Sequence, residues 1–372
     1  MIKRITGRLI RFCCPGALLC LLSAFCGCQT AAYYKQAVSG ELQLLSRRRP
    51  IETLLADPQL DPALRKKFEL TLQARDFAAA ELKLHPDGHY LTYTDLQRTH
   101  AIWNVHAAPE FSLHAKTWWY PLVGRLKYRG YFAREDALKY AGKLAERHLD
   151  VFVEGVDAYS TLGWFKDPIL NTFIHYSETE FAGTIFHELA HQRVFAAGDT
   201  DFNEAFAMSV EQEGVRRWLK KYRDADALKN YERELERNGE FAALLRATRE
   251  KLKLIYGDSD DDRPRVARGT QVSDADKREQ KKAVLEALQH DYAEMKARWQ
   301  GDGSYDNWFA RPVNNAQLNT VATYHDLLPA FEGLLRSTSG DFEMFYAECR
   351  RLAKLSKDER LRRLKEFGVS AP

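Results

Sequence analysis

The sequence predicts a predominantly helical α+β fold in which a small sheet lies beside a central helix. Residues 33–83 are rich in Leu and Ala and carry apolar side chains at the helical period. Residues 90–175 contain short aromatic and β-branched stretches, which are typical of strands, around one helical stretch at 134–148. Helical periodicity then returns over 178–218 and again over 283–372.

The N-terminus has the pattern of a secretory signal. Its basic residues are Lys3, Arg4, Arg8 and Arg11. They precede an apolar run at 15–27 that is too short to cross a membrane as a helix. Phe25-Cys26-Gly27-Cys28 resembles a bacterial lipobox, so we expect cleavage before Cys28 and lipidation of that cysteine. Because Gln29 stands where aspartate would favour the inner membrane, we expect a lipoprotein of the outer membrane that faces the periplasm.

Composition describes an ordinary globular protein. Hydrophobic residues make up 45% of the chain and charged residues 29%, and the formal net charge is +3. This weak charge gives no indication of nucleic-acid binding. Once the signal is removed and Cys28 is lipidated, Cys349 is the remaining cysteine, so we expect no internal disulfide and a buried apolar role for Cys349. The sequence predicts no particular oligomeric state.

The elements follow in order along the chain. The first helices should break at Pro50, Pro58 and Pro62. Three stretches should form strands: Tyr90-Leu91-Thr92-Tyr93, residues 101–105 and Val151-Phe152-Val153. Residues 257–282 are rich in Asp, Arg and Lys and should form a mobile charged loop. We therefore expect a signal over 1–27 and one domain over 28–372, comprising a helical layer (28–89), a core (90–256), the loop (257–282) and a C-terminal helical region (283–372).

The most informative stretch is His187-Glu188-Leu189-Ala190-His191. Ser177 or Thr179 can cap a helix that starts at 178, and Ala-Gly-Asp at 197–199 can stop it. The motif is then expected in the middle of this helix. Because a helix has 3.6 residues per turn, the two histidines share one face and the glutamate lies beside them. This pattern predicts a zinc site with its own general base.

A third protein ligand is expected, because catalytic zinc sites use three protein ligands and one water. A second helical pattern at 201–218 follows a short connection at 197–200, so the two helices should be antiparallel. Asn203 lies near its start, and Glu204 is the preferred ligand. Glu211, two turns further along the same face, is the alternative. The expected ligands of one zinc ion are His187, His191 and Glu204.

These residue types predict amide hydrolysis. Zinc acts as a Lewis acid on a carbonyl and lowers the pKa of its bound water toward about 7. Glu188 takes the proton from that water and passes it to the leaving amine. Tyr324 is the candidate donor to the developing oxyanion.

The substrate is expected along residues 158–168, just before the motif helix. An edge strand there can hold a peptide backbone by strand addition, with Tyr159, Ser160 and Thr161 as contacts. The alternative is a strand and turn that packs Trp164 and Phe165 into the core. We place Asn314-Asn315, from the C-terminal region, along the same cleft.

Together these motifs resemble the putative bacterial aminopeptidase family, zinc-dependent lipoproteins of the HExxH gluzincin type. The resemblance runs from about Cys28 almost to the C-terminus. It includes Gly27-Cys28, Trp103-Asn104-Val105, residues 128–132, 158–168 and 187–192, Gly198-Asp199-Thr200, residues 203–207 and Asn314-Asn315-Ala316. Asn203-Glu204-Ala205-Phe206-Ala207 looks like the element that carries the glutamate ligand in gluzincins.

This resemblance implies a zincin-like metallopeptidase that removes N-terminal residues from peptides. The chain lacks the Gly-x-Met-Glu-Asn element that binds the free amine in well-known gluzincin aminopeptidases. Two other functions share the predicted site. One is a zinc hydrolase of cell-wall amides, and the other is an inactive envelope binding or assembly factor that keeps the zinc fold.

Overall fold

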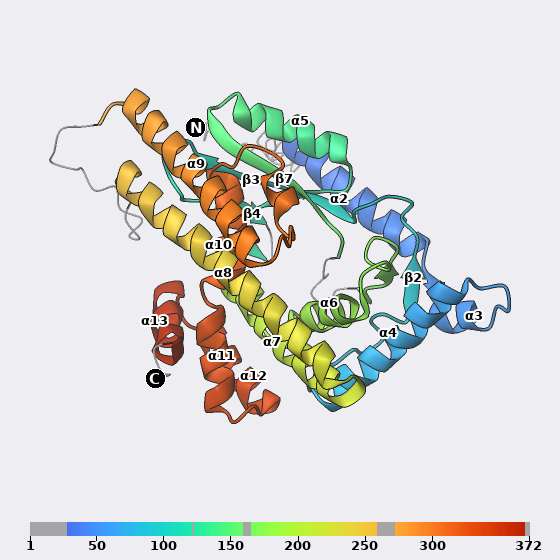
Figure 1. Ribbon diagram of the computed structural model, residues 1–372. Helices are drawn as coiled ribbons and strands as arrows, with labels where there is room; N and C mark the ends of the chain where they lie inside the picture. Colours follow the sequence, from blue (N-terminus) through green and yellow to red (C-terminus); the bar gives the residue numbers. More distant parts are fainter. Residues whose placement is uncertain (1–27, 121–122, 159–164, 259–271, 369–372) are drawn as a thin grey trace, which may run out of the picture. The chain divides into compact units, whose positions relative to one another are not determined.

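Helices make up most of the chain in the computed structural model, which describes residues 28–120, 123–158, 165–258 and 272–368 (Figure 1). The chain divides into two compact units, residues 1–46 and 47–372. Helix α2 (Cys28–Ser46) is the described part of the first unit. The larger unit begins at Arg47. All elements discussed below belong to this larger unit.

The predicted N-terminal helices are confirmed as α3 (Ile51–Leu55) and α4 (Pro62–Ala80). Asp61 caps α4 by accepting a hydrogen bond from the backbone N–H of Leu64. Pro62 occupies the first helical turn, where its missing N–H leaves no intrahelical bond unmade. Pro62 therefore begins α4 as well as separating it from α3.

Within the described residues, the strands form three small sheets rather than one. Their members are β1 (Arg49–Pro50), β2 (Thr92–Thr94) and β8 (Ile169–Leu170); β6 (Arg129–Tyr131), β3 (Ile102–Pro109) and β7 (Leu149–Val156); and β4 (Trp118–Tyr120) with β5 (Gly124–Leu126). The order β6-β3-β7 is antiparallel throughout. Helical and strand content together place the fold in the α+β class that the sequence predicted.

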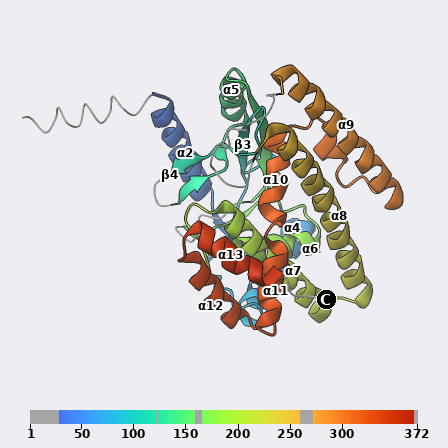
Figure 2. The ribbon, with the colours of Figure 1, turned by 90° about the vertical axis from the view of Figure 1, so that its left-hand side faces the viewer.

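Two helices cover opposite faces of the β6-β3-β7 sheet. Tyr131, which pairs with Trp103, contacts Tyr140 of α5 (Arg134–Ala145), so α5 covers the face that Trp103 presents. Side chains alternate between the two faces of a strand, so Asn104 points the other way. Helix α10 (Asn315–His325) also packs on β3 and β7 (Figure 2). Ala316, Asn319 and Thr320 of α10 line one cavity with Asn104, so α10 lies on the Asn104 side of the sheet.

The motif helix is α6 (Glu178–Ala190), and Ser177 rather than Thr179 caps it. Ser177 and Glu180 form a capping box in which each side chain accepts a hydrogen bond from the backbone N–H of the other residue. The helix ends at Ala190 and His191 is its C-cap, so the prediction that the motif lies in the middle of the helix is wrong. The helix ends before the predicted stop at 197–199, because the chain turns toward α7 (Thr200–Tyr222) directly after His191.

Helices α8 (Ala225–Tyr256) and α9 (Asp274–Arg298) lie side by side (Figures 1 and 2). The predicted loop at 257–282 is therefore wrong over 274–282, which begin α9, while 259–271 lie outside the described residues. Ser273 caps α9. The first helical turns of α9 are polar, but Lys, Arg, Glu and Gln are strong helix formers. The low apolar content of this stretch therefore did not indicate a loop.

The C-terminal region consists of η1 (Asp306–Phe309), α10, α11 (Leu328–Ser337), α12 (Phe342–Ala353) and α13 (Lys357–Gly368). Cys349 is fully buried in α12, as predicted. None of the helices in the described ranges is both long and apolar enough to span a bilayer.

A buried ion pair ties this region to the start of α7. Arg360 on α13 and Asp199, the N-cap of α7, are 6% and 5% exposed and pair through Nη1 and Oδ2. The other guanidinium N–H groups of Arg360 donate to the carbonyls of Leu352, Ala353 and Leu355. The Arg360 side chain therefore donates to the carbonyls at and after the end of α12 and also pairs with the carboxylate of the N-cap of α7.

We expect Arg360→Met to lower the free energy of unfolding by about 3–5 kcal/mol, because it leaves the buried carboxylate of Asp199 with the exposed ammonium of Lys357, 4.0 Å away, in place of a buried counter-charge. Urea denaturation would measure the change. Arg363→Met on the same helix is the control, since Arg363 is half-exposed and should change stability by less than about 1 kcal/mol. Equal effects of the two changes would contradict this role for Arg360.

Candidate metal centre

Three predicted ligands come together between α6 and α7. Nε2 of His187 lies 3.5 Å from Oε2 of Glu204, and Nε2 of His191 lies 3.7 Å from the same oxygen. The candidate ligand atoms of the three residues all lie within 4.8 Å of one another. Although His191 is the C-cap, its φ of −56° and ψ of −22° keep it on the helical path. The two histidines therefore still share one face of α6.

The two helices are antiparallel, as the contacts along them show. Glu204 lies near His191, whereas Glu211, two turns later on α7, contacts His187. Still further back along α6, Gly183 lies against Glu211 and Val215. Moving forward on α7 thus means moving backward on α6, which confirms the predicted arrangement.

The connection between the helices is fixed by side-chain and glycine contacts. The side chain of Asn203 accepts a hydrogen bond from the Ala196 N–H at 2.7 Å and donates to the Ala196 carbonyl at 3.0 Å. Gly198 has a φ of +77°, and a Cβ on Gly124 would lie 2.9 Å from its backbone nitrogen. These contacts hold the chain just before Glu204 and so determine where its carboxylate lies.

Glu211 does not join the ligand cluster but contacts His187 from the other side. Its Oε2 lies 2.9 Å from Nδ1 of His187, which donates a hydrogen bond to it. Gly183 makes room for this approach, because a Cβ there would lie 3.3 Å from Oε1 of Glu211. A carboxylate on the outer nitrogen orients an imidazole and directs the Nε2 lone pair at a metal. The geometry therefore favours Glu204 over Glu211 as the third ligand.

The pKa values of the cluster reflect burial and close carboxylates. Burial lowers the pKa of His191 to about 4, so this imidazole is neutral at pH 7. Burial opposes a charge on His187 as well, but its hydrogen bonds to Glu204 and Glu211 raise its pKa well above the usual value. Burial, together with the nearby charge of Glu204, raises the pKa of Glu188 to about 8 despite the opposing effect of His187.

This donor set fits a zinc ion. Two imidazoles and one carboxylate are a common catalytic zinc set, and a divalent cation would replace the proton that His187 holds. A cation would also lower the pKa of Glu188 and return it to the ionised form that a base requires. The cluster thus has the donors and the base that metal-assisted hydrolysis needs.

Other predicted site residues lie outside what the structure describes. Tyr159, Ser160 and Thr161 are outside the described residues. Tyr324 lies on α10 and Cys28 begins α2, but their side chains are not described. Their expected roles stay predictions.

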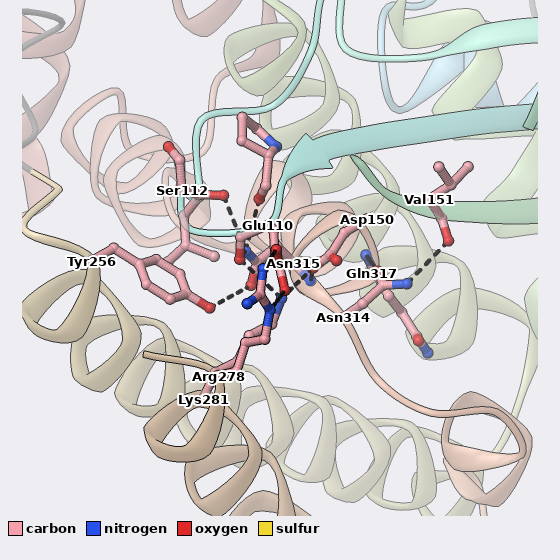
Figure 3. Close-up of polar contacts among 12 residues, drawn as sticks. Glu110, Ser112, Asp150, Val151, Tyr256, Arg278, Lys281, Asn314, Asn315 and Gln317 are labelled. Atoms are coloured by element: carbon pink, nitrogen blue, oxygen red, sulfur yellow. Dashed lines mark hydrogen bonds and ion pairs between the residues drawn. The ribbon is translucent and has the colours of Figure 1, made fainter. Parts of the chain in front are cut away.

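Asn315 does not line a cleft, so the prediction is wrong for that residue. Asn315 is fully buried, and its Oδ1 accepts a hydrogen bond from the hydroxyl of Tyr256 at 3.0 Å (Figure 3). Its Nδ2 donates to the carbonyls of Pro109, Glu110 and Ser112. Asn314 donates to the Val151 carbonyl at 3.0 Å. Both amides instead fasten the start of α10 to β3, β7 and α8, since polar side chains can satisfy carbonyls at strand ends.

A buried contact beside the motif was missed from sequence. Nδ1 of His89 accepts hydrogen bonds from the Asp167 N–H at 3.0 Å and from Nε2 of Gln192 at 3.2 Å. His89 is 1% exposed, and Gln192 directly follows His191. The contact holds the end of α6 against the loop that carries His89. No spacing signals it, because the partners are far apart in the chain.

Comparison with known protein families gives a match over most of the chain. A family model described as "Putative aminopeptidase" matches residues 32–364. No curated protein and no solved structure matches the chain.

The two acidic residues should differ in their effect on metal binding. Glu204→Ala should abolish stoichiometric zinc binding, because it removes one of three ligands. Glu211→Gln should keep the stoichiometry and weaken affinity about 10–100-fold, because it removes only the partner of His187. Competition with a zinc-binding dye would measure both, with Glu213→Gln on the same helix as control. The reverse order of effects would make Glu211 the ligand.

Asn315→Asp should lower the free energy of unfolding by about 3 kcal/mol or more. The Ser112 N–H and Lys281 still donate to the carbonyls of Pro109 and Glu110, but the change sets a buried carboxylate against three carbonyl oxygens. A buried charge left without a partner costs about 3 kcal/mol or more. Urea denaturation is the measurement, and Asn307→Asp at an exposed position of η1 is the matched control. A loss no greater than that of the control would show that the contacts in Figure 3 add nothing.

Proposed function

Since the chain belongs to the putative aminopeptidase family, we propose that it is a zinc-dependent metallopeptidase with a zincin-like site. The observation that carries the proposal is the cluster of His187, His191 and Glu204, with Glu211 behind His187. The family supports a peptidase, and the cluster supports a metal as its means of catalysis. His187, His191 and Glu204 would hold one zinc ion.

The chain's own residues divide the work of hydrolysis. When bound, zinc supplies Lewis acidity that polarises a carbonyl and makes water more acidic. Glu188 lies between the two histidines in sequence and takes the proton from the attacking water, then delivers it to the leaving amine. Glu188 is partly buried, and a bound cation would keep its carboxylate in the ionised form that a base requires. Glu211 holds the imidazole of His187 in its binding orientation.

We also propose that the protein works in the cell envelope. The support is the basic and apolar N-terminus followed by Gly27-Cys28, which together resemble a lipoprotein signal. Lipid on Cys28 would anchor the chain to the outer membrane, where it would face the periplasm. The substrate would then be a periplasmic peptide.

Glu188→Gln should lower the rate of peptide hydrolysis about 10²–10⁴-fold and leave one zinc ion bound per chain, because the change removes the base but no ligand. Metal analysis and cleavage of an unblocked peptide library would measure the two quantities. Glu69→Gln, at an exposed position of α4, is the matched control. Loss of zinc from Glu188→Gln, or full activity of that variant, would contradict the assigned role.

A further inference from the structure

A small cavity lies on the Asn104 side of the β6-β3-β7 sheet, close to the metal centre. Its volume is about 20 Å³. We call it the sheet pocket. Its polar lining includes Asn104, His106 and Glu154 from the sheet, Thr200 from α7, and Asn319 and Thr320 from α10.

The strand register places the polar groups on one face. Asn104 on β3 pairs with Glu154 on β7, so their side chains project from the same face of the sheet. His106, two residues after Asn104, projects from that face too, and its Nε2 lies 2.8 Å from Oε1 of Glu154. The side chain of Glu154 is 34% exposed, so its carboxylate lies where the sheet pocket meets solvent.

Two oxygens of the sheet pocket have no hydrogen-bond partner in the described part of the chain. They are Oδ1 of Asn104 and Oγ1 of Thr200, on residues that are 8% and 6% exposed. A buried polar atom without a partner costs about 1–3 kcal/mol, so two beside one cavity favour a donor group that reaches both once their side chains turn toward it. Lys127 also lines the cavity, but its ammonium is held by both carboxylate oxygens of Asp201 at 2.6 and 2.7 Å.

The sheet pocket is one helical turn from the metal centre. Thr200 and Glu204 are four residues apart on α7, which is about 6 Å along a helix axis. Helical side chains lean toward the N-terminus of their helix, so the carboxylate of Glu204 leans toward Thr200. A ligand group in the sheet pocket therefore lies close to a group at the metal centre.

We propose that the sheet pocket binds the free α-ammonium group of a peptide substrate. An ammonium has three N–H donors. Asn104, Thr200 and Glu154 offer it two neutral oxygens and one carboxylate, and the cavity has room for a group of this size. The inference rests on the proposed peptidase function, because it places the scissile carbonyl, one Cα away from the amine, at the metal centre. It assigns to Glu154 the recognition that the missing Gly-x-Met-Glu-Asn element performs elsewhere.

The test compares trialanine amide with its N-acetyl form on the full chain. Binding is measured by calorimetry in a Glu188→Gln background, with zinc content determined for each variant, and cleavage is measured in chains that keep Glu188. Trialanine amide should bind at least tenfold more tightly than the acetylated peptide. Adding Glu154→Gln should remove this preference, and adding Thr200→Val should reduce it about threefold or more. Glu135→Gln, at an exposed position of α5 on the other face of the sheet, is the matched control and should leave the preference for the free amine unchanged.

The outcomes separate this inference from the peptidase proposal. Cleavage of both peptides, with no preference and no effect of Glu154→Gln, would overturn the ammonium site and leave the peptidase in place. A preference for the free amine that depends on Glu154, in a chain that cleaves neither peptide, would support the ammonium site and overturn the peptidase. Equal binding of the two peptides without any cleavage would overturn both.

Discussion

The antiparallel pairing of α6 and α7 is the constraint on which the candidate centre depends. Two of the candidate ligands come from one helix and the third from the other, so any slip of one helix along the other would move Glu204 away from both histidines. The side chain of Asn203 prevents such a slip by bonding both backbone groups of Ala196. Gly183 allows the helices to approach closely enough for Glu211 to contact His187. Gly183 and the side-chain amide of Asn203 thus set the distance and the register at which the two histidines meet Glu204 and Glu211.

The rest of the larger unit supports this pair from two directions. Arg360 connects the C-terminal helices to the N-cap of α7, and Asn315 joins the start of α10 to the sheet and to α8 (Figure 3). Both side chains are buried and satisfy several backbone carbonyls at once. A buried polar side chain with many partners has few alternative positions, so it specifies where elements meet more sharply than an apolar contact does.

Sequence was sufficient where the chemistry is local. The helical period and a cap at Ser177 or Thr179 predicted α6, and the histidine spacing and the Asn-Glu element predicted that His187, His191 and Glu204 would come together. Sequence failed where the partners are distant in the chain. Asn315 looked like a cleft residue because nothing in its neighbourhood reveals the three carbonyls that it meets, and His89 gave no signal for the same reason. The start of α9 was missed because helices exposed on one side need few apolar residues.

The position of His191 as C-cap has a consequence for how the centre would exchange its ion. The backbone N–H of His191 bonds to the His187 carbonyl at 3.4 Å, which is long for a helix, and the last turn of a helix opens more readily than its middle. His191 would then swing away while His187 and Glu204 stay in place on firmer turns. Metal release and uptake would then follow the local fraying rate of this turn rather than global unfolding. The hydrogen bond from Gln192 to buried His89 would slow the opening of this turn and therefore the exchange of the metal.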